Sequence, residues 1–128
     1  MNENEISKYI VDTAYKIHVE LGPGLLESVY EQIMYYELVE KGFDVDSQVP
    51  IPVEWGGVKM KLGFRADLIV NKKVIVELKS VEHIAPVHPK QLLTYLRLTN
   101  CKLGLLINFN EALIKNGITR VVNKLKDS

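Results

Sequence analysis

Three charged side chains interrupt two apolar segments in the middle of the chain. Asp67 lies within Phe64–Val70, and Glu77 and Lys79 lie within Val74–Lys79. Strands that read as nearly continuous apolar runs are usually covered on both faces, and an unpaired charge in that setting is costly. A structural ion pair or a solvated face would explain any one of the charges, because charged side chains usually face solvent. The three together favour a site that uses the charge.

The distance between the two segments along the chain predicts where their side chains meet. If Asn71–Lys73 forms a three-residue hairpin loop, a common length, Asp67 falls opposite Glu77. In the same register Arg65 falls opposite Lys79. Directly opposed residues share a face, with side chains about 5 Å apart. Two carboxylates that close repel each other unless a proton or a cation lies between them. A two-residue loop would instead place the two carboxylates on opposite faces of the sheet.

Two carboxylates and a lysine suit the hydrolysis of a phosphodiester bond. Oxygen-only ligands select hard cations, Mg²⁺ or Mn²⁺, rather than zinc. Lys79 shares a face with Glu77 because side chains alternate along a strand. A lysine there could hold a phosphate or steer a water near the metal. Carboxylates, a divalent metal and a lysine together make a phosphodiester-hydrolysis site.

Hydrophobic periodicity predicts the elements that position these residues. Apolar spacings of three to four predict helices over about residues 4–21 and 26–41, the first ended by Gly22-Pro23-Gly24. The apolar stripe expected on the second helix consists of Leu26, Val29, Ile33, Tyr36 and Val39. Extended segments are predicted over residues 45–54, 58–70 and 74–80, with a turn at residues 55–57. A third helix is expected from Pro86–Pro89 to about Asn100, with strands over residues 102–109 and 118–122.

The element order α-α-β-β-β-α-β-β predicts an α/β fold of the α+β type, with helices packed on a central mixed sheet. The first strand contains Pro50 and Pro52, and proline cannot donate to a ladder, so this strand is an edge or is irregular. Exposed apolar residues on such an edge would be compatible with a homodimer; here these are Val49, Ile51 and Val53.

Composition sets the broad class. The 128 residues are one domain's worth, so we expect a single domain over residues 1–128. The apolar fraction of 47% and charged fraction of 25% are typical of a soluble globular protein rather than a disordered one. No run reaches the roughly 18 apolar residues of a membrane span. The polar, acidic start is unlike a signal peptide, and the single Cys101 excludes an internal disulfide, so a cytoplasmic protein is expected.

A net charge of zero is only weak evidence against binding to nucleic acid. With 16 Lys and Arg against 16 Asp and Glu, the net charge is zero, whereas nucleic-acid-binding domains are often basic. Phosphate binding, however, depends on where the charge lies. Basic residues gather in and around the proposed hairpin and the third helix: Lys59, Lys61, Arg65, Lys72, Lys73, Lys79 and Lys90. A neutral total predicts modest, salt-sensitive binding without metal.

The chain resembles a known superfamily. Asp67 followed by Glu77-Leu78-Lys79 is similar to the D…(D/E)-x-K signature of the PD-(D/E)XK nuclease superfamily, and the element order resembles its restriction-endonuclease-like core. Residues 24–30 spell G-x-x-E-x-x-Y, the name-giving motif of the GxxExxY protein family, which is grouped with these nucleases. Further similarity lies in residues 64–68, 88–96 and 104–109, and the whole covers about residues 5–122. Ala66 stands where the superfamily's name has proline.

The resemblance implies a role for individual residues. Asp67 and Glu77 would ligate Mg²⁺ or Mn²⁺ together with the Leu78 carbonyl, and Lys79 would position the attacking water. Glu27 looks like the additional acid that many of these nucleases carry on the first core helix, and would act as a further metal and catalytic residue. Gln91 and Tyr95 resemble a Q-x-x-x-Y element on one helix face, in which Gln91 would orient the lysine or the phosphate. The residues assigned to substrate binding are Tyr30, Arg65, His88 and Tyr95.

Each of these residues also has an ordinary structural explanation. An acid such as Glu27 is favoured in any first helical turn by the helix dipole, and Gln91 could be an ordinary first-turn polar residue. Tyr30 and Tyr95 could simply pack, and His88 could cap the third helix. Trp55 lies at a hairpin tip, where packing is favoured over stacking on a base.

These observations predict a small Mg²⁺-dependent nuclease, with DNA favoured over RNA as the substrate. The alternative is a non-catalytic module on the same fold, either a nucleic-acid- or partner-binding domain or a regulatory oligomer. An intact set of Asp67, Glu77 and Lys79 argues against that alternative, because a pure binding domain has no need to crowd two carboxylates where phosphate would lie.

Overall fold

Helix α1 spans Glu3–Leu21 and begins with a capping box. The Asn2 side chain accepts a hydrogen bond from the Glu5 amide at 2.9 Å, and the Glu5 carboxylate accepts one from the Asn2 amide at 3.0 Å. The helix ends at Gly22, whose positive φ of 70° suits glycine. The computed structural model describes residues 1–61 and 63–126, and among these no helix has the length and apolarity needed to cross a membrane.

Helix α2 spans Glu27–Glu40 but is rotated from the orientation that the apolar stripe predicts. Its buried residues are Tyr30, Met34 and Leu38, whereas Leu26 is 73% exposed and Tyr36 is 62% exposed. Both sets repeat at spacings of three to four, so periodicity alone does not choose between the two faces. The Tyr30 ring stacks on Phe109 with centroids 4.3 Å apart, and this contact fixes the face that is buried.

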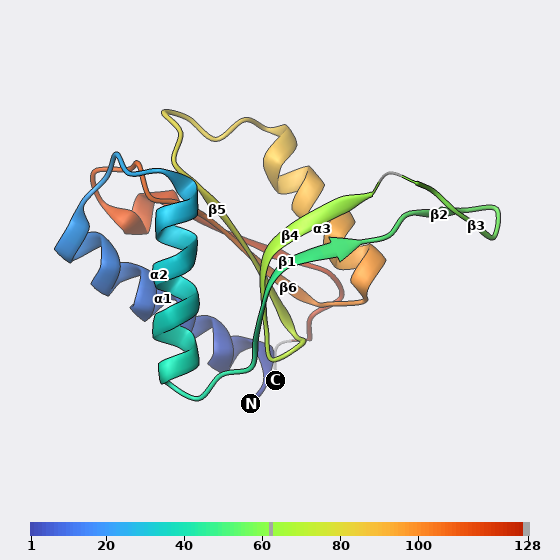
Figure 1. Ribbon diagram of the computed structural model, residues 1–128, viewed down its shortest axis with the longest axis horizontal. Coiled ribbons are helices and arrows are strands. Elements are labelled where there is room, and N and C mark those ends of the chain that lie inside the picture. Colours follow the sequence, from blue (N-terminus) through green and yellow to red (C-terminus); the bar gives the residue numbers. More distant parts are fainter. Residues whose placement is uncertain (62, 127–128) are drawn as a thin grey trace.

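A five-stranded mixed sheet forms the middle layer, in the order β1-β4-β5-β6-β7 (Figure 1). The strands are β1 Val45–Ile51, β4 Phe64–Val70, β5 Val74–Lys79, β6 Leu103–Asn108 and β7 Ile118–Val122. Strands β5 and β6 are parallel and the other pairs are antiparallel. Helix α3, Val87–Thr99, connects the parallel pair, and a short 3₁₀ helix, η1 Ile114–Gly117, precedes β7. The predicted mixed sheet is confirmed, whereas η1 was not expected.

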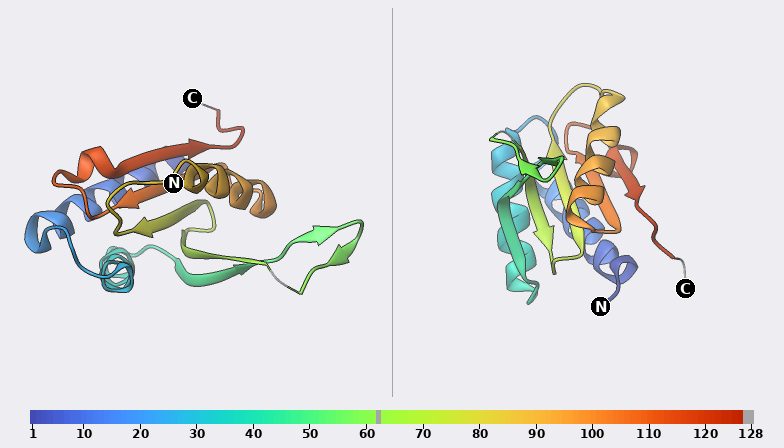
Figure 2. Two further views of the ribbon diagram at one scale, coloured as in Figure 1. Left: turned by 90° about the horizontal axis from the view of Figure 1, so that it is seen from above. Right: turned by 90° about the vertical axis from the view of Figure 1, so that its right-hand side faces the viewer.

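Two apolar clusters hold the layers together. Helices α1 and α2 pack on one face of the sheet, against side chains such as Leu68, Val76 and Leu105. Helix α3 packs on the other face, against Ile69 and Ile75. The sheet is therefore covered on both faces, with α1 and α2 opposite α3 (Figure 2).

Strand β1 is an edge strand, as its prolines predict, but its apolar residues are not exposed. Val45 packs with the α1–α2 cluster, whereas Ile51 is only 2% exposed and packs with the α3 cluster. In a regular strand, residues that are two, four or six positions apart share a face, so Val45 and Ile51 would be expected on the same side. The change of face occurs around Gln48, whose φ is +53°, so β1 is irregular there. The predicted dimerisation edge is therefore wrong for Ile51.

Residues 52–61 form an arm that projects beyond the sheet (Figures 1 and 2). Two short strands, β2 Glu54–Trp55 and β3 Val58–Lys59, pair only with each other in this arm. The Gly56-Gly57 turn joins them with φ values of 60° and 79°. The two long extended segments expected over residues 45–54 and 58–70 are each interrupted here.

Candidate active site

The β4–β5 hairpin has the predicted register. Leu68 pairs with Val76 and Val70 pairs with Val74, so three residues form the loop between the strands. Asn71 and Lys72 both have positive φ, 52° and 58°, which lets the loop turn this tightly. The alternative two-residue loop is excluded, and the next opposed pair beyond Leu68 and Val76 is Asp67 and Glu77.

The two strands separate at this pair and form a fork. Asp67 Oδ2 accepts a hydrogen bond from the Leu78 amide at 2.8 Å, and Glu77 Oε1 accepts a long one from the Asp67 amide at 3.4 Å. The two carboxylates therefore take the place of ladder hydrogen bonds. Paired residues end at Leu68 and Val76, so the predicted pairing of Arg65 with Lys79 is wrong. Strand β4 pairs with β1 on both sides of the fork, from Val70 with Val45 to Phe64 with Ile51, so beyond the fork β1 is its only neighbour in the described sheet.

Glu77 is buried beside Asp67, and this position changes its ionisation. Only 8% of the residue is exposed. Burial and the charge of Asp67 raise the pKa of Glu77 from 4.5 to about 9, although the nearby Lys79 ammonium opposes the rise. Without a cation, the pair therefore shares a proton at neutral pH. A divalent cation would replace that proton.

A third carboxyl group reaches the fork from helix α2. Burial, followed by the charge of Asp67, raises the pKa of Glu31, and the Gln48 amide donates to Glu31 Oε1 at 2.6 Å. Glu31 was not predicted from the sequence. It lies four residues after Glu27, so the two acids share one face of the helix, and this spacing is the signal that could have identified it.

Glu27 lies near the end of β5 rather than beside the two carboxylates. Its Oε1 accepts from the Ser80 amide at 3.2 Å, and the Ser80 hydroxyl donates to the Leu25 carbonyl at 2.6 Å. These bonds join the start of α2 to the residue that follows Lys79. The acid of α2 that is linked to Asp67 is Glu31, and a metal and catalytic role for Glu27 stays a prediction.

Tyr30 belongs to the core rather than to a substrate-binding surface. The residue is fully buried, and its hydroxyl donates to the Gly22 carbonyl at 2.6 Å and accepts from the Leu25 amide at 3.2 Å. No part of the side chain is left to contact a substrate, so the packing explanation holds. Tyr30 fixes the segment that leads into Glu27.

Helix α3 brings one of its predicted residues to the site. The Tyr95 ring lies 5.1 Å from that of Phe64, and burial, together with the charges of Glu77 and Asp67, raises the pKa of the Tyr95 phenol. Gln91 is half-buried one turn earlier on the same helix face. His88 lies in the first turn and makes no capping hydrogen bond; its Nδ1 is buried without a partner among the described residues.

Asn108 is a positioning residue that the sequence analysis did not select. It is fully buried beside Lys79 in the parallel ladder. Its side chain accepts from the Val81 amide at 3.1 Å and donates to the Val81 carbonyl at 2.9 Å. These bonds hold the segment that leaves Lys79. The available signal was a single polar residue at the end of an apolar strand.

The donor set suits a hard cation completed by water. Within residues 1–61 and 63–126, no group of three or more His, Cys, Asp or Glu side chains forms a ready metal cage. The fork instead offers Asp67 and Glu77, and burial together with the charge of Asp67 raises the pKa of Glu77 in the absence of a cation. Mg²⁺ usually keeps several waters and binds through one or two carboxylates, so these residues fit it.

A helix-flanked mixed sheet with acids at a strand fork and a lysine two residues later defines a restriction-endonuclease-like fold. The family model of the PD-(D/E)XK nuclease superfamily matches residues 4–121, so this chain belongs to that superfamily. Membership of the GxxExxY family remains a prediction. A solved structure named "Crystal structure of SSO0001" is similar, with 21% sequence identity, a TM-score of 0.49, and coverage of 94% of this chain and 79% of that one. No curated protein matches this chain.

Proposed function

We propose that this protein is a metal-dependent nuclease that hydrolyses phosphodiester bonds. One observation supports the proposal most directly: the Asp67 and Glu77 carboxylates converge at the strand fork, where Glu77 is buried. Such a pair is costly to bury unless a cation or proton joins it. Superfamily membership implies nucleic acid as the substrate class, and we propose DNA rather than RNA.

Asp67 and Glu77, with the Leu78 carbonyl, would hold Mg²⁺ or Mn²⁺. The Leu78 amide faces Asp67, and the N–H and C=O of one strand residue point to the same side, so its carbonyl also faces the fork. Glu31, rather than Glu27, is the acid that we assign to the third position. A bound divalent cation would supply Lewis acidity and offset the charge that develops on the phosphate.

Lys79 would position the attacking water and bind the phosphate. It follows Glu77 on the same face of β5, and its ammonium is close enough to oppose the rise of the Glu77 pKa. Tyr95 keeps its phenol protonated because its pKa is raised, so the hydroxyl can donate to a phosphate oxygen. Gln91, one turn away on the same face, would orient Lys79 or the phosphate.

A cleavage assay with matched variants tests the proposal. Labelled single- and double-stranded DNA and RNA are incubated with Mg²⁺ or Mn²⁺ and the wild-type protein, Asp67→Asn or Lys79→Gln. We expect each variant to lose about 100-fold or more in rate. Asp12→Asn and Lys8→Gln are the matched controls, because both residues are exposed on α1.

Two results would contradict the proposal. Cleavage that survives both site variants would show that other residues, or a contaminant, perform it. Failure to cleave any of the four substrates, with no heat of Mn²⁺ binding by calorimetry, would favour the non-catalytic module.

A further inference from the structure

The arm, residues 52–61, exposes apolar side chains that the fold does not use. Trp55 at its tip is 80% exposed and Val58 is 60% exposed. The packing expected for Trp55 is therefore wrong. Two cross-strand pairs, Glu54 with Lys59 and Trp55 with Val58, hold the tip together, and the Met60 amide donates to the Val53 carbonyl at 2.8 Å beside them. A hairpin this short gains little stability for the domain, so its exposed tryptophan points to a contact with another molecule.

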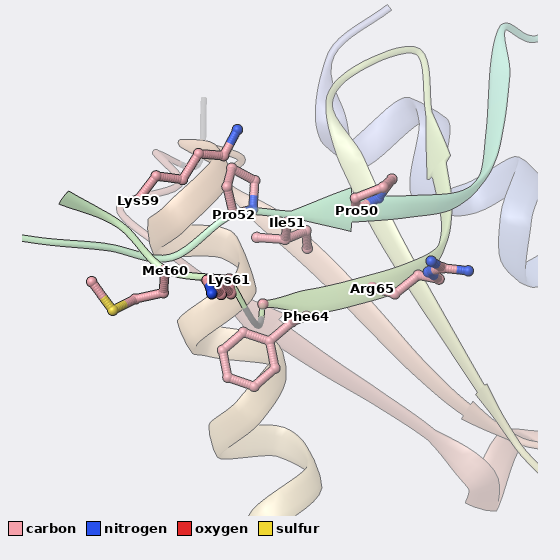
Figure 3. Close-up of a pocket in the computed structure, with 9 residues that line it drawn as sticks. Pro50, Ile51, Pro52, Lys59, Met60, Lys61, Phe64 and Arg65 are labelled. Atoms are coloured by element: carbon pink, nitrogen blue, oxygen red, sulfur yellow. The ribbon is translucent and has the colours of Figure 1, made fainter.

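The base of the arm is a basic pocket. A cavity of about 420 Å³ lies between the arm and the β1–β4 edge, and its cationic residues are Lys59, Lys61 and Arg65. Its described lining contains no acidic residue, and no ion pair among the described residues involves any of the three cations. Figure 3 shows the three side chains spread around this pocket, with Lys59 and Lys61 on the arm side and Arg65 along β4. Three unpaired cations around one hollow are complementary to phosphate groups.

This basic pocket adjoins the candidate active site. Arg65 lies two residues before Asp67 on β4, roughly 7 Å along the strand. Phe64, which also lines the pocket, packs against Tyr95. A nucleic-acid strand with one phosphate at Asp67 could therefore continue past Arg65 to the lysines, with Trp55 beyond them.

We propose that the arm binds an unpaired segment of nucleic acid next to the cleavage point, with phosphates on Lys59, Lys61 and Arg65 and a base stacked on Trp55. Stacking on an aromatic side chain requires an unpaired base, and a basic track with an aromatic platform is the usual way that proteins hold single strands. This inference rests on the proposed nuclease function, because it places the bound strand next to a cleavage point. Binding of the strand to the arm can nevertheless be tested without cleavage.

Trp55 is the only tryptophan in the chain, so its fluorescence reports directly on stacking. The Asp67→Asn protein is titrated in EDTA with single-stranded DNA or RNA of about 12 nucleotides. Fluorescence quenching and the anisotropy of the labelled oligonucleotide are measured together. We expect quenching on binding, and a weakening of about 5- to 100-fold in the added Trp55→Ala variant, whereas Trp55→Phe retains most of the affinity.

The lysines are tested through the salt dependence of binding. The double variant Lys59→Gln, Lys61→Gln should lower the slope of log affinity against log salt by about 0.7 for each phosphate that the protein no longer neutralises. Lys8→Gln, the same change on α1, should leave the slope unaltered. Because Trp55 and the lysines are exposed, circular dichroism and thermal unfolding should show that all of these variants fold.

The inference is overturned if Trp55→Ala binds as tightly as its parent, if no quenching accompanies binding, or if duplex DNA binds more tightly than either single strand. Cleavage is scored separately. Binding through the arm by a protein that never cleaves would remove the proposed function and leave the arm's role intact. Cleavage by a protein whose arm variants bind as tightly as their parent would support the proposed function and remove the arm's role.

Discussion

At the scale of single residues, the site depends on a carboxyl pair that is unfavourable without a partner. Asp67 and Glu77 are both needed as acceptors for backbone amides at the fork, yet burial and mutual repulsion keep a proton on the pair. The stability of the metal-free protein should therefore depend on pH, and metal binding should release a proton.

The pH dependence has a definite sign. The pKa of Glu77 is about 9 in the folded protein and 4.5 as its ordinary value, so the folded state binds the proton more tightly. The stabilisation is complete below pH 4.5 and is lost as the pH rises toward about 9. We expect the Tm of the metal-free wild type to fall across this range and that of Glu77→Gln to fall less. Thermal unfolding in EDTA measures this, with Asp12→Asn as control. Parallel curves for wild type and Glu77→Gln would contradict it.

The two acids of α2 should differ in their effect on metal binding. Glu31 is linked to Asp67, whereas Glu27 bonds to the Ser80 amide. Glu31→Gln should weaken Mn²⁺ binding about 10-fold, as loss of a supporting group often does, and Glu27→Gln should weaken it less. Isothermal titration calorimetry of both variants gives the comparison. A larger loss for Glu27→Gln would restore the role first expected for that residue.

At the scale of elements, the orientation of α2 and the irregularity of β1 create the site. The buried face of α2 carries Tyr30, Met34 and Leu38, and this orientation brings Glu31 to Asp67. The stripe predicted from periodicity carries more apolar residues than the buried face, so the helix could not be oriented from its own sequence. In β1 the irregular position Gln48 places its amide on Glu31, next to the point where β4 leaves β5.

Two truncations on α2 test which face is packed. Met34 is fully buried, so Met34→Ala should lower the free energy of unfolding by about 2–5 kcal/mol. Val29 belongs to the stripe expected from periodicity but is exposed, so Val29→Ala should cost less than about 1 kcal/mol. Urea unfolding of the two variants provides the measurement. A loss for Val29→Ala as large as that for Met34→Ala would contradict this packing, and a larger one would mean that α2 packs in the orientation the stripe predicts.

At the scale of the whole molecule, a net charge of zero conceals a separation of charge. Glu31, Asp67 and Glu77 gather at the fork, and cations line the base of the arm. The acids oppose a phosphate until a cation neutralises them. Metal and nucleic acid should therefore bind cooperatively rather than independently.

This cooperativity can be measured with a substrate that is not cleaved. Mn²⁺ should raise the affinity of the wild type for a phosphorothioate-protected oligonucleotide by about 10-fold or more, since couplings of 5- to 150-fold are typical. It should have little effect on the double variant Asp67→Asn, Glu77→Gln, which lacks both the charge and the ligands. Fluorescence anisotropy with and without Mn²⁺ tests this. An equal metal effect on both proteins would place the responsible cation elsewhere.

Most of the elements could be predicted because their signals are local. The capping box and Gly22 bound α1, and the three-residue loop sets the β4–β5 register. Pro50 marks the edge strand correctly. Predictions failed where a residue's environment depends on segments far away in the chain, as in the burial of Ile51 and the exposure of Trp55, and for the same reason the contact of Glu31 with Asp67 was not foreseen.

The sequence alone determined that Glu77 and Lys79 share a face of their strand and, given a three-residue loop, that Asp67 lies opposite Glu77, because strand alternation and hairpin register depend on neighbouring residues. Only the tertiary structure decided that the strands separate at this pair and that Glu31 is the third acid there. It also decided that the arm extends away from the core with Trp55 at its tip. These features follow from how helices and strands pack against one another, and two apolar faces of one helix differ only in what lies opposite them.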